Sequence, residues 1–388
     1  MPNITGQNRF LKVLGVLLIL CLCGGAVTAG LRLLHPASGS SGVVPAKPIS
    51  PPSRTVDLLI HGHASSSPVL VSPDLSDMMT ASGVRNLIEI DKAREALSES
   101  AAFWKSRREK GFEAIVLGTS PGDLAIVRML LESPIWVLAD VSPHGFFFLE
   151  KGTSPWAPGD CLRFAPKGMN RQGRALWAGL TMDNLTAVGR GDLAAGLLRD
   201  LPDDLAETGP VLAARASLKA SSGNWEGSAS LASKALDAGG GIPARMILVR
   251  ALIEEGRHGE ALRQAERMVE ERRDAATLFL LARAANAAGD LGTEIESLSG
   301  VVDYGRSHGL PLSASLTYLG QALARNGERG PALRALEEAL SDPSLTPPQK
   351  DALREMIDHI RPASTGEASR DDHSGRSLSS SNGRSPGE

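Results

Sequence analysis

Two histidines that stand close together are the first residues that could do chemistry. His61 and His63 flank a glycine at the end of an apolar run, so the alternation of a strand would place both rings on one face. Paired imidazoles can ligate a metal, but a closed zinc site needs three or four ligands. The spacing supplies no further ligand, and we therefore expect no metal and no cofactor.

Carboxylates offer a second chemistry, general acid–base catalysis. Asp74 and Asp77 lie in the segment PDLSDM, and Glu89 and Asp91 end another apolar run. Acidic residues are common beside strands and helix starts. No HExxH motif and no histidine partner for Cys161 accompanies them. We therefore predict that the chain is not an enzyme. The catalytic alternative would use His61, His63 or Asp91.

A strand-to-helix turn, GTSPGD from Gly118, is the third candidate. Free backbone N–H groups at such a turn can bind an anion. Thr119 or Ser120 can equally cap a helix that begins near Pro121 or Gly122. Because neither a GxGxxG nor a GxxxxGK[ST] motif is present, we favour the capped helix start and predict no nucleotide site.

Charge and cysteine content narrow the remaining functions. The formal net charge is −3, without the basic excess that nucleic-acid binding needs, so we expect no nucleic-acid partner. Of the three cysteines, Cys21 and Cys23 lie in an apolar N-terminal run, which leaves Cys161 alone. One remaining thiol cannot form an intramolecular disulfide or a cysteine zinc site, so cysteine usage leaves the compartment open.

The N-terminal segment indicates a membrane. Nineteen uncharged residues separate Lys12 from Arg32. As a helix they would span roughly 28 Å, close to the hydrocarbon core of a bilayer. We predict a single transmembrane anchor at residues 13–34 after a cytoplasmic start at residues 1–12, because basic residues precede the anchor. The bulk of the chain would then be extracytoplasmic, on the periplasmic side. The same residues also fit a secretory signal cleaved near Ala29, which would make the protein secreted.

The middle of the chain alternates between strand and helix patterns. Residues 35–55 are rich in Pro, Ser and Gly and predict a linker, and residues 362–388 predict a disordered tail. Over residues 56–165, alternation indicates a small α/β domain, a sheet between helices. Strand-like runs begin at Val56, Pro68, Asn86, Glu113, Pro134 and Gly145, and helical runs cover residues 91–110 and 122–132.

The segments VLVSPDLSDMM, GVRNLIEID, GFEAIVLGTSPGDLA and PIWVLADVSPHGFFFLEKG follow one another within residues 55–165. In this order they resemble the soluble α/β domain that follows the membrane region in bacterial membrane proteins similar to protein O-mannosyltransferases. The resemblance implies a role in envelope glycan assembly, as an accessory or an enzyme. In that family the catalytic acid lies in a multi-spanning membrane region, whereas this sequence has one candidate span. No catalytic residue can therefore be transferred.

From Arg174 onward the sequence is rich in Ala and Leu, has a helical period, and repeats a short phrase that begins with glycine. The copies begin at Gly191 (GDLAAGL), Gly223 (GNWEGSA), Gly256 (GRHGEAL), Gly289 (GDLGTEI) and Gly327 (GERGPAL), spaced by 32, 33, 33 and 38 residues. Glycine suits the end of the first helix of a hairpin, where the backbone becomes left-handed. The spacing is close to the 34-residue tetratricopeptide period, so we predict five repeats over residues 174–361.

Both helices of the copy around Tyr318, YLGQALARNGERGPALRALEEAL, resemble tetratricopeptide-repeat proteins. Small residues recur seven before and five after the glycines and let the two helices approach, whereas Asn184, Val249 and Glu294 break this pattern. The resemblance implies an α-solenoid whose first helices present side chains to an extended peptide or a partner helix. The candidate partner-binding residues on first helices are Lys219, Arg250, Arg283 and Asn286.

These patterns combine into one hypothesis. The fold class is α/β plus all-α, with an N-terminal transmembrane helix, a small α/β domain and a C-terminal α-solenoid. The function we predict is that of a membrane-anchored scaffold that binds other proteins at the cell envelope through its repeats. Two alternatives stay open: a role in envelope glycan assembly through the α/β domain, and self-association of the repeats.

Overall fold

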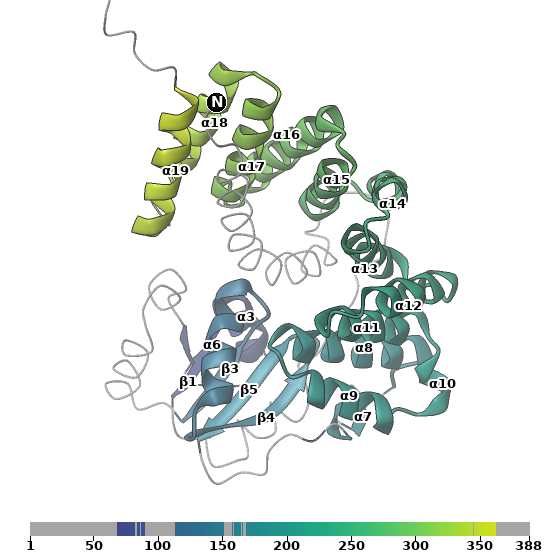
Figure 1. Cartoon of the computed structure of the whole chain (residues 1–388). Coiled ribbons are helices and arrows are strands. Elements are labelled where there is room, and N and C mark those ends of the chain that lie inside the picture. The colour runs from purple at the N-terminus through teal and green to yellow at the C-terminus, as the bar shows by residue number, and fades with distance from the viewer. Residues whose placement is uncertain are drawn as a thin grey trace, which may run out of the picture.

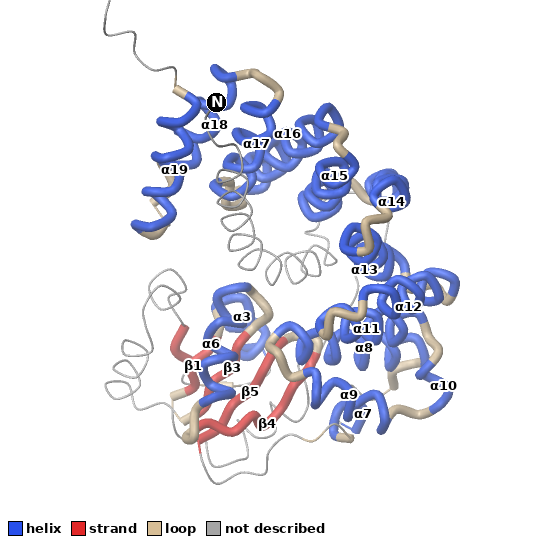
Figure 2. Tube along the Cα trace, in the orientation of Figure 1, coloured by secondary structure: helices blue, strands red, loops and turns tan. Residues whose placement is uncertain are grey.

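The computed structural model describes residues 68–81, 84–85, 87–89, 113–150, 157, 159–163, 165, 168–343 and 345–361. It contains a small sheet followed by a curved array of helices, as the sequence predicts (Figures 1 and 2). Several predicted features lie outside these residues: the anchor at 13–34, the strand at Val56, His61 and His63, the helix at 91–110 with Asp91, and the tail.

Among the described helices, we find none with both the length and the apolar character needed to cross a bilayer.

The sheet has five strands in the order β2-β1-β3-β5-β4. Its strands are β1 (Val69–Val71), β2 (Leu87–Glu89), β3 (Ala114–Leu117), β4 (Trp136–Ser142) and β5 (Gly145–Glu150). The first three strands are parallel, whereas β5 is antiparallel to β3 and forms a hairpin with β4. Residue Ile115 marks the centre of the register, opposite Leu70 on one side and Phe148 on the other.

Helices cover both faces of the sheet. Helix α3 (Pro73–Ala81), which the sequence analysis missed, packs through Leu75 and Met79 on the face that carries Val69 and Phe147. Helix α6 (Pro121–Glu132), which was expected, packs on the opposite face. Alternating residues of each strand therefore contact different helices, as the pleat requires.

The array consists of five helix pairs and a closing helix. The pairs are α8 (Arg171–Ala187) with α9 (Gly191–Asp200), α11 (Gly209–Ser221) with α12 (Trp225–Asp237), α13 (Gly241–Glu254) with α14 (His258–Glu271), α15 (Ala275–Ala288) with α16 (Leu291–His308), and α17 (Ser313–Arg325) with α18 (Arg329–Leu340). Two short helices, α7 (Asp160–Arg163) and α10 (Asp203–Ala206), lie before and after the first pair, and α19 (Pro347–Ile360) follows the last.

The turn inside each pair corrects one detail of the sequence analysis. The left-handed glycine of the first pair is Gly189, with φ 83°, and Gly191 is instead the first residue of α9. In every pair the residue after the left-handed glycine donates its N–H to the carbonyl of the residue five positions earlier, as Arg190 does to Leu185 at 2.8 Å. The turn glycines are therefore Gly189, Gly223, Gly256, Gly289 and Gly327, spaced by 34, 33, 33 and 38 residues.

With Gly189 as the turn glycine, the residues seven before and five after it in the first repeat are Met182 and Ala194. Met182, seven before Gly189, is fully buried, and Ala194, five after it, is also buried. Asn184 does not occupy the helix-crossing position that the sequence analysis gave it. Its side-chain amide donates instead to the backbone carbonyl of Ser142 in β4 at 2.8 Å.

The sheet and the first helix pairs share one hydrophobic core. The cluster that contains Ile115 and Phe148 continues without interruption into Trp177 and Met182 of α8 and Leu197 of α9. Polar contacts cross the same boundary: Arg128 of α6 donates to the carbonyl of Ala187 at 2.7 Å, at the end of α8. The first repeat is thus packed on the sheet, in addition to its packing on the second repeat.

Candidate protein-binding surface

The corrected register identifies one equivalent position on each first helix. The residue six before the turn glycine is Asp183, Ser217, Arg250, Arg283 and Gln321 in the five repeats. Two of the four residues proposed from the sequence, Arg250 and Arg283, therefore occupy the same structural position in neighbouring repeats. Charge along this row changes from acidic beside the sheet to basic in the middle of the array.

Contacts between successive first helices show where this row lies. Ser217 of α11 hydrogen-bonds the carboxyl of Asp183 in α8, and Arg283 of α15 lies 3.9 Å from Glu254 of α13. In Figure 1, α13 and α15 follow the inner side of the arc, whereas α12 and α14 follow its outer side. The row therefore lies where successive first helices meet, on the helices that form the inner side of the array, and we call this surface the inner face.

The third and fourth repeats add an apolar side chain to each arginine. Met246 stands four residues before Arg250, and Phe279 stands four residues before Arg283. Residues four apart are neighbours on one face of a helix. Both apolar side chains are half-buried, and Phe279 also makes an edge-to-face contact with Tyr318 of α17 at a ring distance of 5.5 Å. The inner face thus carries two equivalent pairs, each with one apolar group and one guanidinium.

Asn286, the third sequence candidate, is part of a polar cluster between helices. Its side-chain amide donates to Glu294 Oε1 of α16 at 2.9 Å, and Arg325 of α17 binds the same oxygen. Glu294 is buried where the other repeats have alanine or serine. This carboxylate holds three successive helices together, and the amide nitrogen of Asn286 is used in doing so.

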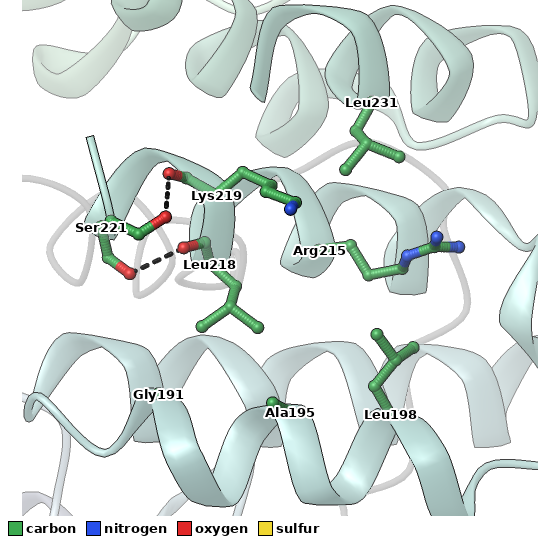
Figure 3. A pocket seen from close by; sticks show the side chains of 9 residues that line it. Gly191, Ala195, Leu198, Arg215, Leu218, Lys219, Ser221 and Leu231 are labelled. Carbon is green, nitrogen blue, oxygen red and sulfur yellow. Dashed lines mark hydrogen bonds between the residues drawn. The ribbon is translucent and has the colours of Figure 1, made fainter. Parts of the chain in front are cut away.

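Lys219, the fourth candidate, lies away from the other three. Positions 217 and 219 are two residues apart, and this spacing puts them on nearly opposite sides of α11. Lys219 lines a hollow between α9, α11 and α12 (Figure 3), together with Leu198, Leu218 and Leu231. The structure therefore separates the sequence candidates into an inner-face pair, a structural amide and a residue of a different pocket.

The sheet does not offer a comparable site among the described residues. Asp123 is buried at the start of α6, where its Oδ2 accepts hydrogen bonds from Ser72 at 2.9 Å and Ser120 at 2.6 Å. Ser120 Oγ in turn accepts from the backbone N–H of Asp123 at 3.2 Å. The predicted capped helix start is confirmed, and its carboxylate opposes the binding of an anion there.

The other candidate carboxylates that the structure describes in the α/β segment lie on the surface. Asp74 and Asp77 are exposed on α3, and Glu89 is exposed on β2. No group of three potential metal ligands occurs within the described ranges. Cys161 is buried, and desolvation raises the pKa of its thiol to about 12, which makes it a poor nucleophile at neutral pH.

Comparison with known proteins finds likenesses among solved structures only. No family model and no curated protein matches the chain. The tetratricopeptide-repeat protein YrrB, described as having an unusual peptide-binding site, is 16% identical over 47% of this chain and 90% of its own, with a TM-score of 0.38. A crystal form of MamA is 16% identical over 42% and 94%, with a TM-score of 0.35.

A thermophilic tetratricopeptide-repeat protein of Thermus thermophilus is 15% identical over 49% of this chain and 98% of its own, with a TM-score of 0.37. Likenesses of this size carry no argument about partners or function. The assignment of a tetratricopeptide-like helical repeat rests on the five turns and helix pairs described above. The resemblance of residues 55–165 to the domain of O-mannosyltransferase-like proteins stays a prediction.

Proposed function

We propose that this protein is a non-catalytic scaffold whose inner face, at the third and fourth repeats, binds a partner segment with alternating apolar and acidic side chains. The observation that carries the proposal is the repetition of one chemical pair: Met246 with Arg250, and Phe279 with Arg283. An extended partner with an acidic residue near each arginine and an apolar residue near Met246 and Phe279 would complement this face.

The cellular setting is a second part of the proposal. The apolar segment at residues 13–34 supports a membrane anchor, and the linker at 35–55 would hold the sheet and array at a distance from the bilayer. In this arrangement the partner is another protein of the cell envelope. Self-association of the array would appear instead as a sedimentation coefficient that rises with protein concentration.

Charge reversal on the inner face tests the binding site. The double variant Arg250→Glu and Arg283→Glu, expressed as the full chain, is compared with the wild type by affinity capture from detergent-solubilised membranes. We expect capture of the partner to weaken by at least roughly tenfold, a change of about 1.4 kcal/mol, because attraction to its carboxylates becomes repulsion. Point variants are preferable to deletion of residues 174–361, because such a deletion removes the part of the core that α8 shares with the sheet.

The matched control carries the same charge change on the outer helix α14. Arg263 and Arg267 are both exposed there, and their replacement by Glu leaves the inner face unchanged. The proposal predicts that this control captures the partner as the wild type does. Equal capture by both double variants, with unchanged helical circular dichroism, would show that the inner-face arginines do not bind the partner.

A further inference from the structure

The boundary between the first and second repeats lacks a layer that the later repeats fill. The residues eight and four before the turn glycine are Leu248 and Leu252 in the third repeat, and they are buried. The fourth and fifth repeats have buried apolar residues at both positions: Leu281 with Ala285, and Leu319 with Leu323. In the second repeat the same two positions carry Arg215 and Lys219.

The opposing helix of the first repeat is also depleted at this boundary. Two and six residues after its turn glycine stand Gly191 and Ala195. The corresponding pairs in the later repeats are Trp225 with Ala229, His258 with Leu262, Leu291 with Ile295, and Arg329 with Leu333. Gly191 lies against Leu218, since a Cβ at this glycine would be only 3.1 Å from Leu218 Cδ1, so no side chain from this position enters the boundary. Three departures from the repeat pattern, Arg215, Lys219 and Gly191, therefore meet at one place, where Ala195 is also small.

The result is a hollow of about 540 Å³ between α9, α11 and α12 (Figure 3). Its walls are mainly apolar: Leu218 points from α11 toward α9, Leu198 points from α9 toward α11, and Leu231 of α12 lies on the other side of the Lys219 and Arg215 side chains. Two of the lining residues, Arg215 and Lys219, carry positive charge. Arg215 is 3.1 Å from the exposed carboxylate of Glu207, whereas the ammonium of Lys219 has no ion pair with any residue in the described part of the chain.

We propose that this hollow binds an aliphatic carboxylate, a fatty acid, with its alkyl chain against the leucines and its carboxylate beside Lys219 and Arg215. Hollows of about 300–1,000 Å³ suit small molecules, whereas a stable protein interface takes roughly 20–30 residues a side. This hollow has nine lining residues and belongs to one repeat boundary.

The polar groups of the hollow also favour an alkyl chain over a peptide. The hydroxyls of Ser221 and Ser222 donate within α11, to the carbonyl oxygens of Leu218 at 2.8 Å and Lys219 at 2.9 Å. They are therefore not free to donate to the carbonyl groups of an extended peptide, and burying such groups without partners is costly. An alkyl chain has no groups of this kind, and a single carboxylate matches the two cations at the rim.

Photoaffinity labelling of the full chain locates the ligand directly. The probe is dodecanoate that carries a diazirine on its alkyl chain, and labelled peptides are identified by mass spectrometry. We expect labelling on α9, α11 and α12 that unlabelled dodecanoate suppresses and dodecyltrimethylammonium does not. Two variants should each reduce it by roughly tenfold: Lys219→Glu, which reverses the charge at the rim, and Ala195→Leu, which fills the hollow as Leu262 and Leu333 do in their repeats.

Lys234→Glu is the matched control, because the substitution makes the same charge change at an exposed residue of α12 that does not line the hollow. It should label as the wild type does. Absence of labelling at these helices in the wild type would overturn the proposal. Labelling that persists in the folded Lys219→Glu and Ala195→Leu variants would overturn it too. The inner-face arginines are not involved, so this test is independent of the proposed scaffold function.

Discussion

Asp183 is an acidic side chain in a site that disfavours its charged form. It lies at the contact between α8 and α11, and its Oδ1 has no hydrogen-bond partner among the described residues. Burial raises the pKa of this carboxyl from 3.8 to about 7, and the hydrogen bond from Ser217 opposes that rise. At neutral pH this carboxyl is therefore only partly charged.

The raised pKa of Asp183 predicts how stability depends on pH. Between about pH 4 and pH 7 the folded carboxyl binds more protons than the unfolded one, so the free energy of unfolding falls as the pH rises through this window. The full effect is at most about 4 kcal/mol, at 1.36 kcal/mol for each unit of pKa. Asp183→Asn should therefore raise the melting temperature at pH 8 relative to the wild type and flatten its pH dependence.

Thermal unfolding followed by circular dichroism at pH 5, 6.5 and 8 checks this prediction. Ser217→Ala serves as the second variant, because loss of a hydrogen bond that lowers the pKa of Asp183 should extend the pH-dependent window upward. A wild-type profile that is flat between pH 5 and 8, or an Asp183→Asn profile as steep as that of the wild type, would show that this carboxyl titrates normally.

At the scale of the elements, the turns determine the register of the whole array. Gly189 has a left-handed backbone, which an L-residue enters at a cost of about 1–2 kcal/mol. Gly191 lies in the first turn of α9, where alanine is the better helix former by roughly 0.5–1 kcal/mol. Gly189→Ala should lower the free energy of unfolding by about 1 kcal/mol. Gly191→Ala should leave it nearly unchanged, because the gain in helix propensity is offset by the tight contact of the new methyl group with Leu218.

Urea denaturation of the two single variants measures this difference. The variants are matched, since they make the same substitution two residues apart in one turn. Equal destabilisation, or a larger loss for Gly191→Ala, would mean that the first repeat has the register expected from the sequence and not the one in the structure.

The array was predictable because its signal is local and repeated. Glycines about 33 residues apart, each followed by a helical run, identify helix hairpins without any knowledge of tertiary contacts. The register of the first repeat was not predictable, because Gly189 and Gly191 are two residues apart and only the backbone hydrogen bonds distinguish them. Helix α3 escaped notice because it is short, with only Leu75 and Met79 buried.

The site was predictable in part for a related reason. Arg250 and Arg283 were chosen as polar residues on first helices, and both fall on the inner face. Lys219 and Asn286 were chosen by the same rule but lie elsewhere, because the rule ignores the helical phase relative to the turn glycine. Counting back from each turn glycine would have separated them, and would also have shown that Arg215 and Lys219 occupy positions that are buried and apolar in the later repeats.

At the scale of the whole molecule, the sheet and the first repeat should unfold together. Trp177 of α8 is buried in the core that contains Phe148 of the sheet. Replacing a buried aromatic residue by alanine typically costs about 3–5 kcal/mol. Trp177→Ala should therefore speed hydrogen exchange of the backbone amides in β3 and β5 as well as those in α8, although the substitution lies within the array.

Leu353→Ala on α19 is the control for this coupling. Leu353 is also buried, but its hydrophobic cluster belongs to the other end of the array. Exchange should then increase in α17, α18 and α19 and stay unchanged in the sheet. If Trp177→Ala left exchange in the strands unaltered, the sheet and the array would be independent folding units.

Site-specific crosslinking in living cells tests most directly whether the inner face of the third and fourth repeats contacts a partner protein. Phe279 is replaced by p-benzoylphenylalanine, and Glu266, which is exposed on the outer helix α14, is replaced in a matched chain. After irradiation, the chain modified at position 279 should yield a crosslinked species of higher mass, whereas the chain modified at position 266 should not. A crosslink from position 266 with none from position 279 would contradict the proposed binding surface.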